Sequence, residues 1–151
     1  MKIFISGSIS IKKLRKRDYP FLEELVEGNK TILIGDAYGV DKAVQEYLHR
    51  NEYQNVIVYY SGENIRNNIG NWQTEHILNP DNLMGRLLYK LKDKAMDDDC
   101  DSALMFWNGK SKGTQLNMEY LDELDKYYLA VVKDGLYVGN IHKINNTKSA
   151  L

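Results

Sequence analysis

The chain of 151 residues is poor in cysteine and proline, with one Cys and two Pro. The single cysteine, Cys100, excludes an internal disulfide framework and fits a reducing compartment. No apolar run approaches the ~20 residues that a membrane-spanning helix requires. The apolar N-terminus turns polar at Ser6, too early for a signal peptide. The sequence therefore predicts a cytoplasmic protein without a membrane partner.

An excess of one charge is also missing, because 20 basic and 21 acidic residues leave a formal net charge of −1. This balance argues against wholesale binding of a nucleic-acid polymer. The one dense basic run is Lys12–Arg17. We interpret it as a solvated surface segment, with a place beside an anionic ligand as the alternative.

Residue patterns typical of metal sites are absent as well. The three histidines are dispersed and show no zinc-type spacing: His49, His76 and His142. The acidic run Asp97–Asp99, followed by Asp101, lacks the EF-hand pattern and is interpreted as an exposed helix end. We therefore predict no metal site and no cofactor.

The chain does contain alternating strand and helix patterns. Short apolar runs rich in β-branched residues predict strands at 2–5, 31–34, 56–60, 103–107 and 129–132. Apolar residues at helical spacing predict helices at 19–28, 42–50, 83–98 and 115–128. In the third helix the inward face is predicted to consist of Leu87, Leu88, Leu91 and Ala95. Gly28 is the predicted stop of the first helix.

This alternation predicts an α/β fold, a Rossmann-like, doubly wound, mostly parallel five-stranded sheet. The strand order cannot be read from the alternation, and we take the Rossmann-like order 3-2-1-4-5. Asp134-Gly135 predicts a type I′ turn into an antiparallel edge strand at 136–138. Residues 63–82 show no clean period, and loops of this length are usually functional or mobile. One domain is expected over residues 1–144, followed by a polar tail at 145–151.

Glycine loops follow four of the predicted strands, at Gly7, Gly35, Gly62 and Gly109. In doubly wound sheets ligands bind at the carboxyl ends of the strands, where the strand order reverses. The first and fourth predicted strands flank that reversal. Ser6-Gly7-Ser8 is therefore expected to lie beside Gly109–Thr114.

The segment Trp107–Thr114 has the order strand, glycine loop, helix that holds a phosphate. Its two glycines, Gly109 and Gly113, allow close backbone approach. Lys110 and Lys112 add positive charge, and Ser111 and Thr114 add hydroxyl donors. The spacing differs from Walker A, and an ordinary strand-to-helix turn with solvated lysines is the alternative interpretation.

Phosphate contacts alone would bind weakly. Three or four charge-assisted hydrogen bonds, at ~1.5–3 kcal/mol each, do little more than offset an association cost of ~4–15 kcal/mol. A base stacked on an aromatic ring would add ~1–3 kcal/mol. The candidates for stacking are Trp72, Trp107 and Tyr38, with core packing as the alternative for Trp107.

A second hypothesis is hydrolysis at a glycosidic carbon, which needs a carboxylate near the reacting centre. The candidates are Asp36, Asp41 and Asp93, with Asp36 preferred because it directly follows a strand-end glycine. A helix cap or first-turn acid is the alternative role for Asp41.

Four motifs, taken together and in this order, resemble one known family. They are Gly35-Asp36-Ala37-x-Gly39-x-Asp41-Lys42-Ala43, Arg66-Asn67-Asn68-x-Gly70-x-Trp72, Lys92-Asp93-Lys94-Ala95-Met96 and Trp107–Thr114. Over residues 1–133 the chain resembles the SLOG superfamily, above all its small bacterial and phage members. The resemblance implies a Rossmann-like fold, a site for nucleotides or nucleotide-linked sugars, and a homo-oligomer. Relatives include cytokinin-releasing phosphoribohydrolases and sensors of signalling nucleotides in antiviral systems.

Three positions depart from the pattern of similar proteins. Ile9 stands where an Arg is frequent, so that Lys12 or Arg66 would have to supply its charge. Asn108 replaces a usual Asp. Asn117 replaces the catalytic Glu of the phosphoribohydrolases, and Glu119 lies about 200° around the helix. These departures weaken the hydrolase hypothesis more than the binding hypothesis.

We therefore predict a protein that binds a small nucleotide or nucleotide-derived signalling molecule, as a sensor or a sequestering protein. A phosphoribohydrolase or a protein-interaction module remains the alternative. Asp36 and Asp93 are the catalytic candidates. The predicted ligand-binding residues are Ser6, Gly7, Ser8, Gly35, Asp36, Gly39, Asp41, Arg66, Asn67, Trp72, Asn108, Gly109, Lys110, Ser111, Gly113, Thr114 and Asn117.

Overall fold

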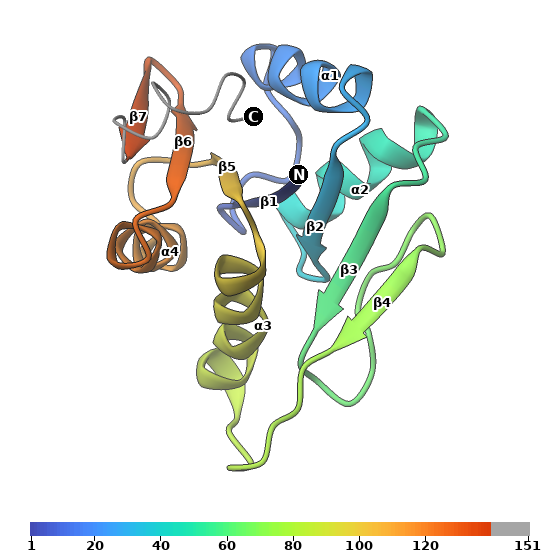
Figure 1. The fold of residues 1–151 in the computed structure, drawn as a ribbon, viewed down its shortest axis with the longest axis vertical. Coiled ribbons are helices and arrows are strands. Elements are labelled where there is room, and N and C mark those ends of the chain that lie inside the picture. The colour runs from blue at the N-terminus through green and yellow to red at the C-terminus, as the bar shows by residue number, and fades with distance from the viewer. Residues whose placement is uncertain (140–151) are drawn as a thin grey trace.

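The computed structural model describes residues 1–139 (Figure 1). Its strands are β1 (Lys2–Gly7), β2 (Thr31–Gly35), β3 (Val56–Tyr60), β4 (Gln73–His76), β5 (Ser102–Phe106), β6 (Tyr127–Val132) and β7 (Gly135–Gly139). Its α-helices are α1 (Tyr19–Glu27), α2 (Val40–Arg50), α3 (Gly85–Asp99) and α4 (Lys112–Glu123), and a short 3₁₀ turn, η1 (Lys16–Asp18), precedes α1.

One seven-stranded sheet has the order β4-β3-β2-β1-β5-β6-β7. All neighbouring pairs are parallel except β6 and β7, which form the C-terminal antiparallel hairpin. The chain runs outward from β1 in one direction through β2 and β3, and in the other through β5 and β6. The predicted doubly wound α/β fold is therefore confirmed, and the strand order reverses between β1 and β5.

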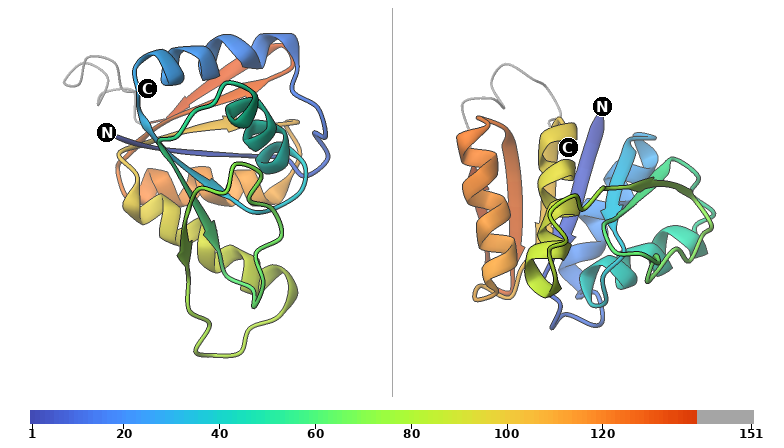
Figure 2. Two further views of the ribbon diagram at one scale, coloured as in Figure 1. Left: turned by 90° about the vertical axis from the view of Figure 1, so that its right-hand side faces the viewer. Right: turned by 90° about the horizontal axis from the view of Figure 1, so that it is seen from below.

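Helices cover both faces of the sheet (Figure 2), and an apolar cluster fills each of the two layers between helices and sheet. Leu22 and Leu25 of α1 pack with Val44 and Leu48 of α2 against one face. On the other face, α3 and α4 contribute Met96, Met118 and Leu121. Parallel strands buried on both faces read as continuous apolar runs, which is why β1, β2 and β5 were visible in the sequence.

The strand β4 was missed by the sequence analysis. Its four side chains are polar and exposed, so it carries neither an apolar run nor an alternating pattern. It pairs with β3 through its backbone, in the register Ile57↔Gln73 to Tyr60↔His76. A strand at the edge of a sheet needs no apolar face, and part of the segment expected to be irregular is therefore ordered.

The predicted stop of the first helix at Gly28 is confirmed, since α1 ends at Glu27 and Gly28 is its C-cap, with φ −78°, while Asn29, with φ 50°, adopts the left-handed conformation that follows. The predicted turn at Asp134-Gly135 is wrong. The pair Val132↔Gly135 closes the hairpin, so its turn residues are Lys133 and Asp134. Neither has positive φ, which a type I′ turn requires. The predicted domain end at residue 144 and the tail at 145–151 lie outside the described residues.

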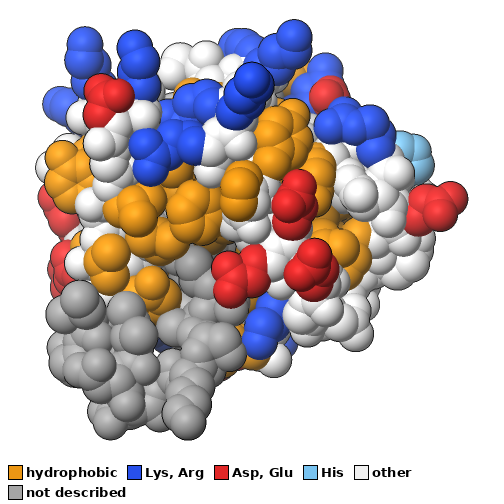
Figure 3. Space-filling model, turned by 90° about the horizontal axis from the view of Figure 1, so that it is seen from above, with side chains coloured by type: hydrophobic (Ala, Val, Ile, Leu, Met, Phe, Trp, Pro, Cys, Tyr) orange, Lys and Arg blue, Asp and Glu red, His pale blue; other side chains and the backbone are white. Residues whose placement is uncertain are grey.

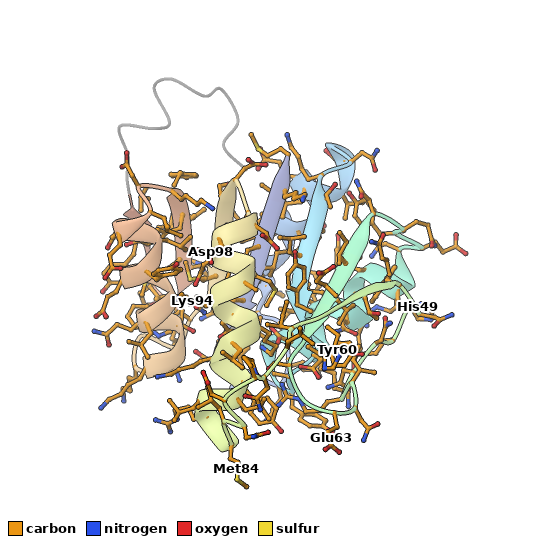
Figure 4. The ribbon with its side chains drawn as sticks, turned by 60° about the horizontal axis from the view of Figure 1, so that its bottom comes forward. His49, Tyr60, Glu63, Met84, Lys94 and Asp98 are labelled. Carbon is orange, nitrogen blue, oxygen red and sulfur yellow. The ribbon has the colours of Figure 1, made fainter. Side chains whose placement is uncertain are left out.

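The inward face of α3 also differs from the prediction. Leu87 is 57% exposed, whereas Lys92 and Asp97 are buried. Charged residues were assumed to face solvent, but here two of them face the protein interior. At the outer surface, Lys94 and Asp98 point from α3 toward α4 (Figure 4), where the Asp98 carboxylate accepts a hydrogen bond from the Tyr120 hydroxyl at 2.7 Å.

The basic run is only partly solvated. Lys and Arg side chains gather along one rim of the face shown in Figure 3. Arg15, however, donates to the backbone carbonyls of Trp107 and Val131 and pairs with Asp18 at 3.0 Å. Arg15 therefore bonds the connection between β1 and α1 to the carboxyl ends of β5 and β6. Within the described residues, no helix is both long and apolar enough to cross a membrane.

Candidate ligand-binding pocket

A pocket of about 630 Å³ lies at the carboxyl ends of β1 and β5, with α3 and α4 on its sides. Ten of the predicted binding residues line it: Ser6, Gly7, Ser8, Asp41, Arg66, Asn108, Ser111, Gly113, Thr114 and Asn117. The catalytic candidate Asp93 also lines it. Seven predicted residues do not: Gly35, Asp36, Gly39, Asn67, Trp72, Gly109 and Lys110.

Two loops about a hundred residues apart in sequence meet at this pocket. The hydroxyls of Ser8 and Ser111 are hydrogen-bonded at 2.8 Å, and the backbone N–H of Asn108 donates to Ser8 Oγ at 3.0 Å. Gly7 allows the contact, because a Cβ there would lie 2.2 Å from the Phe106 carbonyl oxygen. The expected proximity of residues 6–8 and 109–114 is therefore present.

Asn108 shapes the loop between β5 and α4. Its Oδ1 accepts hydrogen bonds from the backbone N–H groups of Lys110 and Ser111, both at 2.8 Å. Gly109 adopts φ +82°, which favours glycine. The side chain of Asn108 thus supplies the acceptor that orders the loop, and its amide nitrogen donates to Ser10 Oγ.

The first turn of α4 faces the pocket. Ser111 is its N-cap but makes no side-chain hydrogen bond to the first-turn backbone. Within residues 1–139, the N–H groups of Lys112, Gly113 and Thr114 have no hydrogen-bond acceptor. A Cβ added to Gly113 would meet nothing within 4 Å. This turn therefore offers three free donors and the positive end of the helix dipole.

A buried charge cluster forms the pocket wall next to β2. Lys92 is 4% exposed, and its Nζ lies 2.8 Å from Asp93 Oδ1 and 3.9 Å from Asp41 Oδ2. Burial alone would lower the pKa of Lys92, but the two carboxylates outweigh it and raise the pKa, so the ammonium stays charged. Gly35 leaves the room for this, because a Cβ there would lie within 2.7 Å of both Asp41 Oδ2 and Lys92 Nζ.

The carboxyl group of Asp41 in this cluster has a raised pKa. Burial raises its pKa to about 6, and the attraction of Lys92 opposes that shift only in part. The Asp93 carboxylate is held differently, since Asn117 Nδ2 approaches it at 3.4 Å and also donates to Ser6 Oγ at 3.3 Å. The pocket thus contains two carboxyl groups in unlike surroundings.

Asp36 is not available to a ligand in the way the sequence suggested. It is 1% exposed, and its oxygens accept from the backbone N–H, Nε and Nη2 of Arg66 at 2.9, 3.2 and 2.7 Å. The predicted role of Asp36 in accepting ribose or base hydrogen bonds does not match this placement. Its carboxylate instead fixes Arg66, which reaches the pocket.

The tryptophans are also structural. Trp72 is 6% exposed, packs in the core, and donates its indole N–H to the Tyr53 carbonyl at 2.8 Å. Its ring has no open face for a ligand, so the predicted stacking role does not fit. Trp107 is buried and donates to the Ser111 carbonyl. Tyr38 is 51% exposed but does not line the pocket.

Other predicted residues shape the loop after β2 from behind. Gly39 adopts φ +80° against the backbone of Ile9, and Asn67 donates to the carbonyl oxygens of Asp36 and Ala37.

The acidic run Asp97–Asp99, predicted to be an exposed helix end, is partly buried. Asp97 is 1% exposed, and burial raises its pKa to about 9. No group of acidic, histidine or cysteine side chains in the described part of the chain could hold a metal ion.

The sequence analysis missed the α3 side of the pocket. Arg86, Tyr89 and Lys90 line it together with Asp93. These positions follow the i, i+3, i+4, i+7 spacing of one helix face. That spacing was present in the sequence, but the inward face of this helix was predicted from its apolar residues alone, and the polar residues between them were left out.

Fold and pocket define a Rossmann-like α/β protein whose open site lies at the reversal of strand order. Comparison with protein-family models, with curated proteins and with solved structures found no match.

Proposed function

We propose that this protein binds a small nucleotide-derived molecule, with the ligand's phosphate at the first turn of α4. The observation that carries the proposal is the joined pair of loops after β1 and β5. Among residues 1–139 the N–H groups of residues 112–114 find no acceptor there and are open to the pocket. Helix N-termini with free N–H groups bind phosphates. Open α/β sheets bind ligands where the strand order reverses.

The charge around the pocket supports an anionic ligand. Arg86, Lys90 and Lys112 line the pocket, and within the described residues none of them pairs with a carboxylate. The two lining carboxylates, Asp41 and Asp93, share the buried ammonium of Lys92. The free positive charges therefore outnumber the free negative ones at this site, and they attract anions.

The resemblance to the SLOG superfamily supports the same ligand class. Within that resemblance, we propose a sensor or a sequestering protein for a signalling nucleotide, acting as a homo-oligomer. Asn117 favours binding over turnover, because an amide cannot serve as a general base in place of the Glu of the phosphoribohydrolases.

The test is calorimetric titration of Gly113→Asp with AMP, GMP, CMP and UMP. Free space around Gly113 lets the variant fold, and its carboxylate would repel a phosphate at the same spot. We expect at least a tenfold loss of affinity. Gln115→Asp is the matched control, since it adds the same charge to an exposed position of α4 outside the pocket. Unchanged affinity in folded Gly113→Asp would contradict the phosphate site.

A second candidate function, hydrolysis of a nucleoside monophosphate, is favoured by the two unlike carboxyl groups. Asp93, beside Lys92, would orient water or stabilise the developing positive charge on the sugar, and Asp41, whose pKa burial raises to about 6, would donate a proton to the departing base. Chromatography of incubated nucleotides tests it, since free base must appear and must disappear in Asp93→Asn. Tight binding without turnover favours a sensor. An interaction module predicts no small-molecule binding at all.

A further inference from the structure

Tyr89 and Arg66 form a stacked pair in the wall of the pocket. The guanidinium carbon of Arg66 lies 3.9 Å from the centroid of the Tyr89 ring. The pair joins the first half of α3 to the connection between β3 and β4, and Ser61 Oγ adds a hydrogen bond to the Leu88 carbonyl at 2.6 Å. Figure 4 shows this end of the molecule, with Met84 at the start of α3 and Glu63 in the connection.

The orientation of the pair is fixed from behind. The buried carboxylate of Asp36 accepts from Nε and Nη2 of Arg66, a two-point contact that sets the plane of the guanidinium. A third bond, from the backbone N–H of Arg66, holds the loop itself. The guanidinium is therefore preorganised rather than free to follow a ligand.

The pair is nevertheless accessible. The Arg66 side chain is 23% exposed, Tyr89 is 37% exposed, and both line the pocket. Tyr89 is the only aromatic residue among those that line the pocket in the described part of the chain. Flat heterocycles stack on tyrosine rings and on guanidinium planes alike.

We propose that the Tyr89–Arg66 pair is the platform on which the ligand's planar heterocycle stacks, so that this pocket selects ligands with an aromatic base over sugar phosphates. The inference rests on the proposed function, because it assumes a ligand whose phosphate lies at α4. It assigns the stacking role to a residue on α3, in place of the tryptophans suggested by the sequence.

The experiment compares AMP with ribose 5-phosphate, which has the sugar and phosphate but no base. Both are titrated calorimetrically into the wild-type protein, Tyr89→Leu and Tyr89→Phe. Tyr38→Leu is the matched control, because Tyr38 is also exposed and lies near a cation, Lys42, but outside the pocket. Thermal unfolding of each variant checks that it is folded.

In Tyr89→Leu we expect a loss of AMP affinity of about tenfold, the scale of one lost stacking contact, with ribose 5-phosphate affinity unchanged. Tyr89→Phe and Tyr38→Leu should keep wild-type AMP affinity. Equal losses for both ligands, or no loss for either, would overturn the platform while leaving the phosphate site intact. Wild-type protein that binds neither ligand would instead overturn the proposed function, and the platform with it.

Discussion

The loops that follow β2 and β5 look alike in sequence, since each places a glycine and polar residues between a buried strand and a helix. In the structure they differ. After β2, Asp36 is bonded to Arg66 and Asp41 lies beside Lys92, so its acidic groups are already paired. After β5, three N–H groups at the start of α4 have no hydrogen-bond acceptor within residues 1–139. The comparison separates a loop whose acidic groups are paired within the protein from a loop that leaves backbone donors open to the pocket.

The largest effect is expected from removing the buried ammonium of Lys92, which lies on α3 and pairs with Asp41 after β2. Lys92→Met leaves Asp93 and Asp41 without their ammonium partner, and breaking a buried pair in this way costs about 3–5 kcal/mol of unfolding free energy. Lys112→Met, the same substitution at the exposed start of α4, should change the free energy of unfolding by less than about 0.5 kcal/mol. Urea unfolding measures both. Equal destabilisation of the two variants would abolish the distinction between the loops.

How far this distinction was predictable depends on the range of the interactions. The parallel sheet followed from local apolar runs and from the rule that links alternating elements to parallel sheets. The strand order was taken from the usual Rossmann-like arrangement. That order placed Ser8 near Ser111 correctly, because neighbouring parallel strands bring their carboxyl ends together. Polar β4 gave no such signal, since its pairing depends on the exposed edge of β3.

Closure of the loop after β2 could not be read from the sequence. Asp36 meets a guanidinium thirty residues away, and Lys92 reaches Asp41 only because Gly35 has no side chain. No local pattern encodes such pairs, so Asp36 was expected to be free for a ligand. The burial of Trp72 was missed for the same reason, because its hydrogen-bond partner, Tyr53, belongs to a different connection.

The next prediction uses pH to test whether Asp41, which follows β2, is buried in the folded protein. The pKa of Asp41 is raised from 3.8 to about 6 in the folded protein, mainly by burial. The folded state therefore binds this proton more tightly than the unfolded state does. The resulting stabilisation is complete below about pH 4 and is lost as the pH rises through 6, a change of about 3 kcal/mol at ~1.4 kcal/mol per pH unit.

Asp41→Asn removes this titration. The difference in unfolding free energy, wild type minus variant, should fall between pH 4 and pH 7 in urea titrations. Glu119→Gln, on the exposed side of α4, controls for the loss of one carboxylate. A difference that stays constant or rises over this range would show that Asp41 is not held in a desolvated site.

A smaller effect on stability is expected in the loop between β5 and α4. Asn108→Ala removes the acceptor of two backbone N–H groups, which water can then partly solvate, so the cost should be about 1 kcal/mol. AMP affinity should fall as well, because the first turn of α4 loses its fixed approach. Asn55→Ala is the control, since it removes a hydrogen bond to the Asn29 carbonyl outside the pocket and should leave AMP affinity within twofold. Unchanged AMP affinity in Asn108→Ala would show that Asn108 does not position the phosphate site.

The smallest effect distinguishes a glycine required by the fold from one kept for a ligand. At Gly35 a Cβ would lie 2.5 Å from Asp41 Oδ2, so Gly35→Ala should destabilise the protein. Gly113 has no neighbour within 4 Å and lies in the first turn of α4. Gly113→Ala should therefore stabilise the protein by about 0.5–1 kcal/mol, the usual gain of alanine over glycine in a helix. Its AMP affinity should nevertheless fall, since the methyl group occupies open space beside the free N–H groups. Thermal unfolding and calorimetry on the same preparation measure the two changes. A variant that is more stable and binds AMP as well as the wild type would show that Gly113 has no role at the pocket.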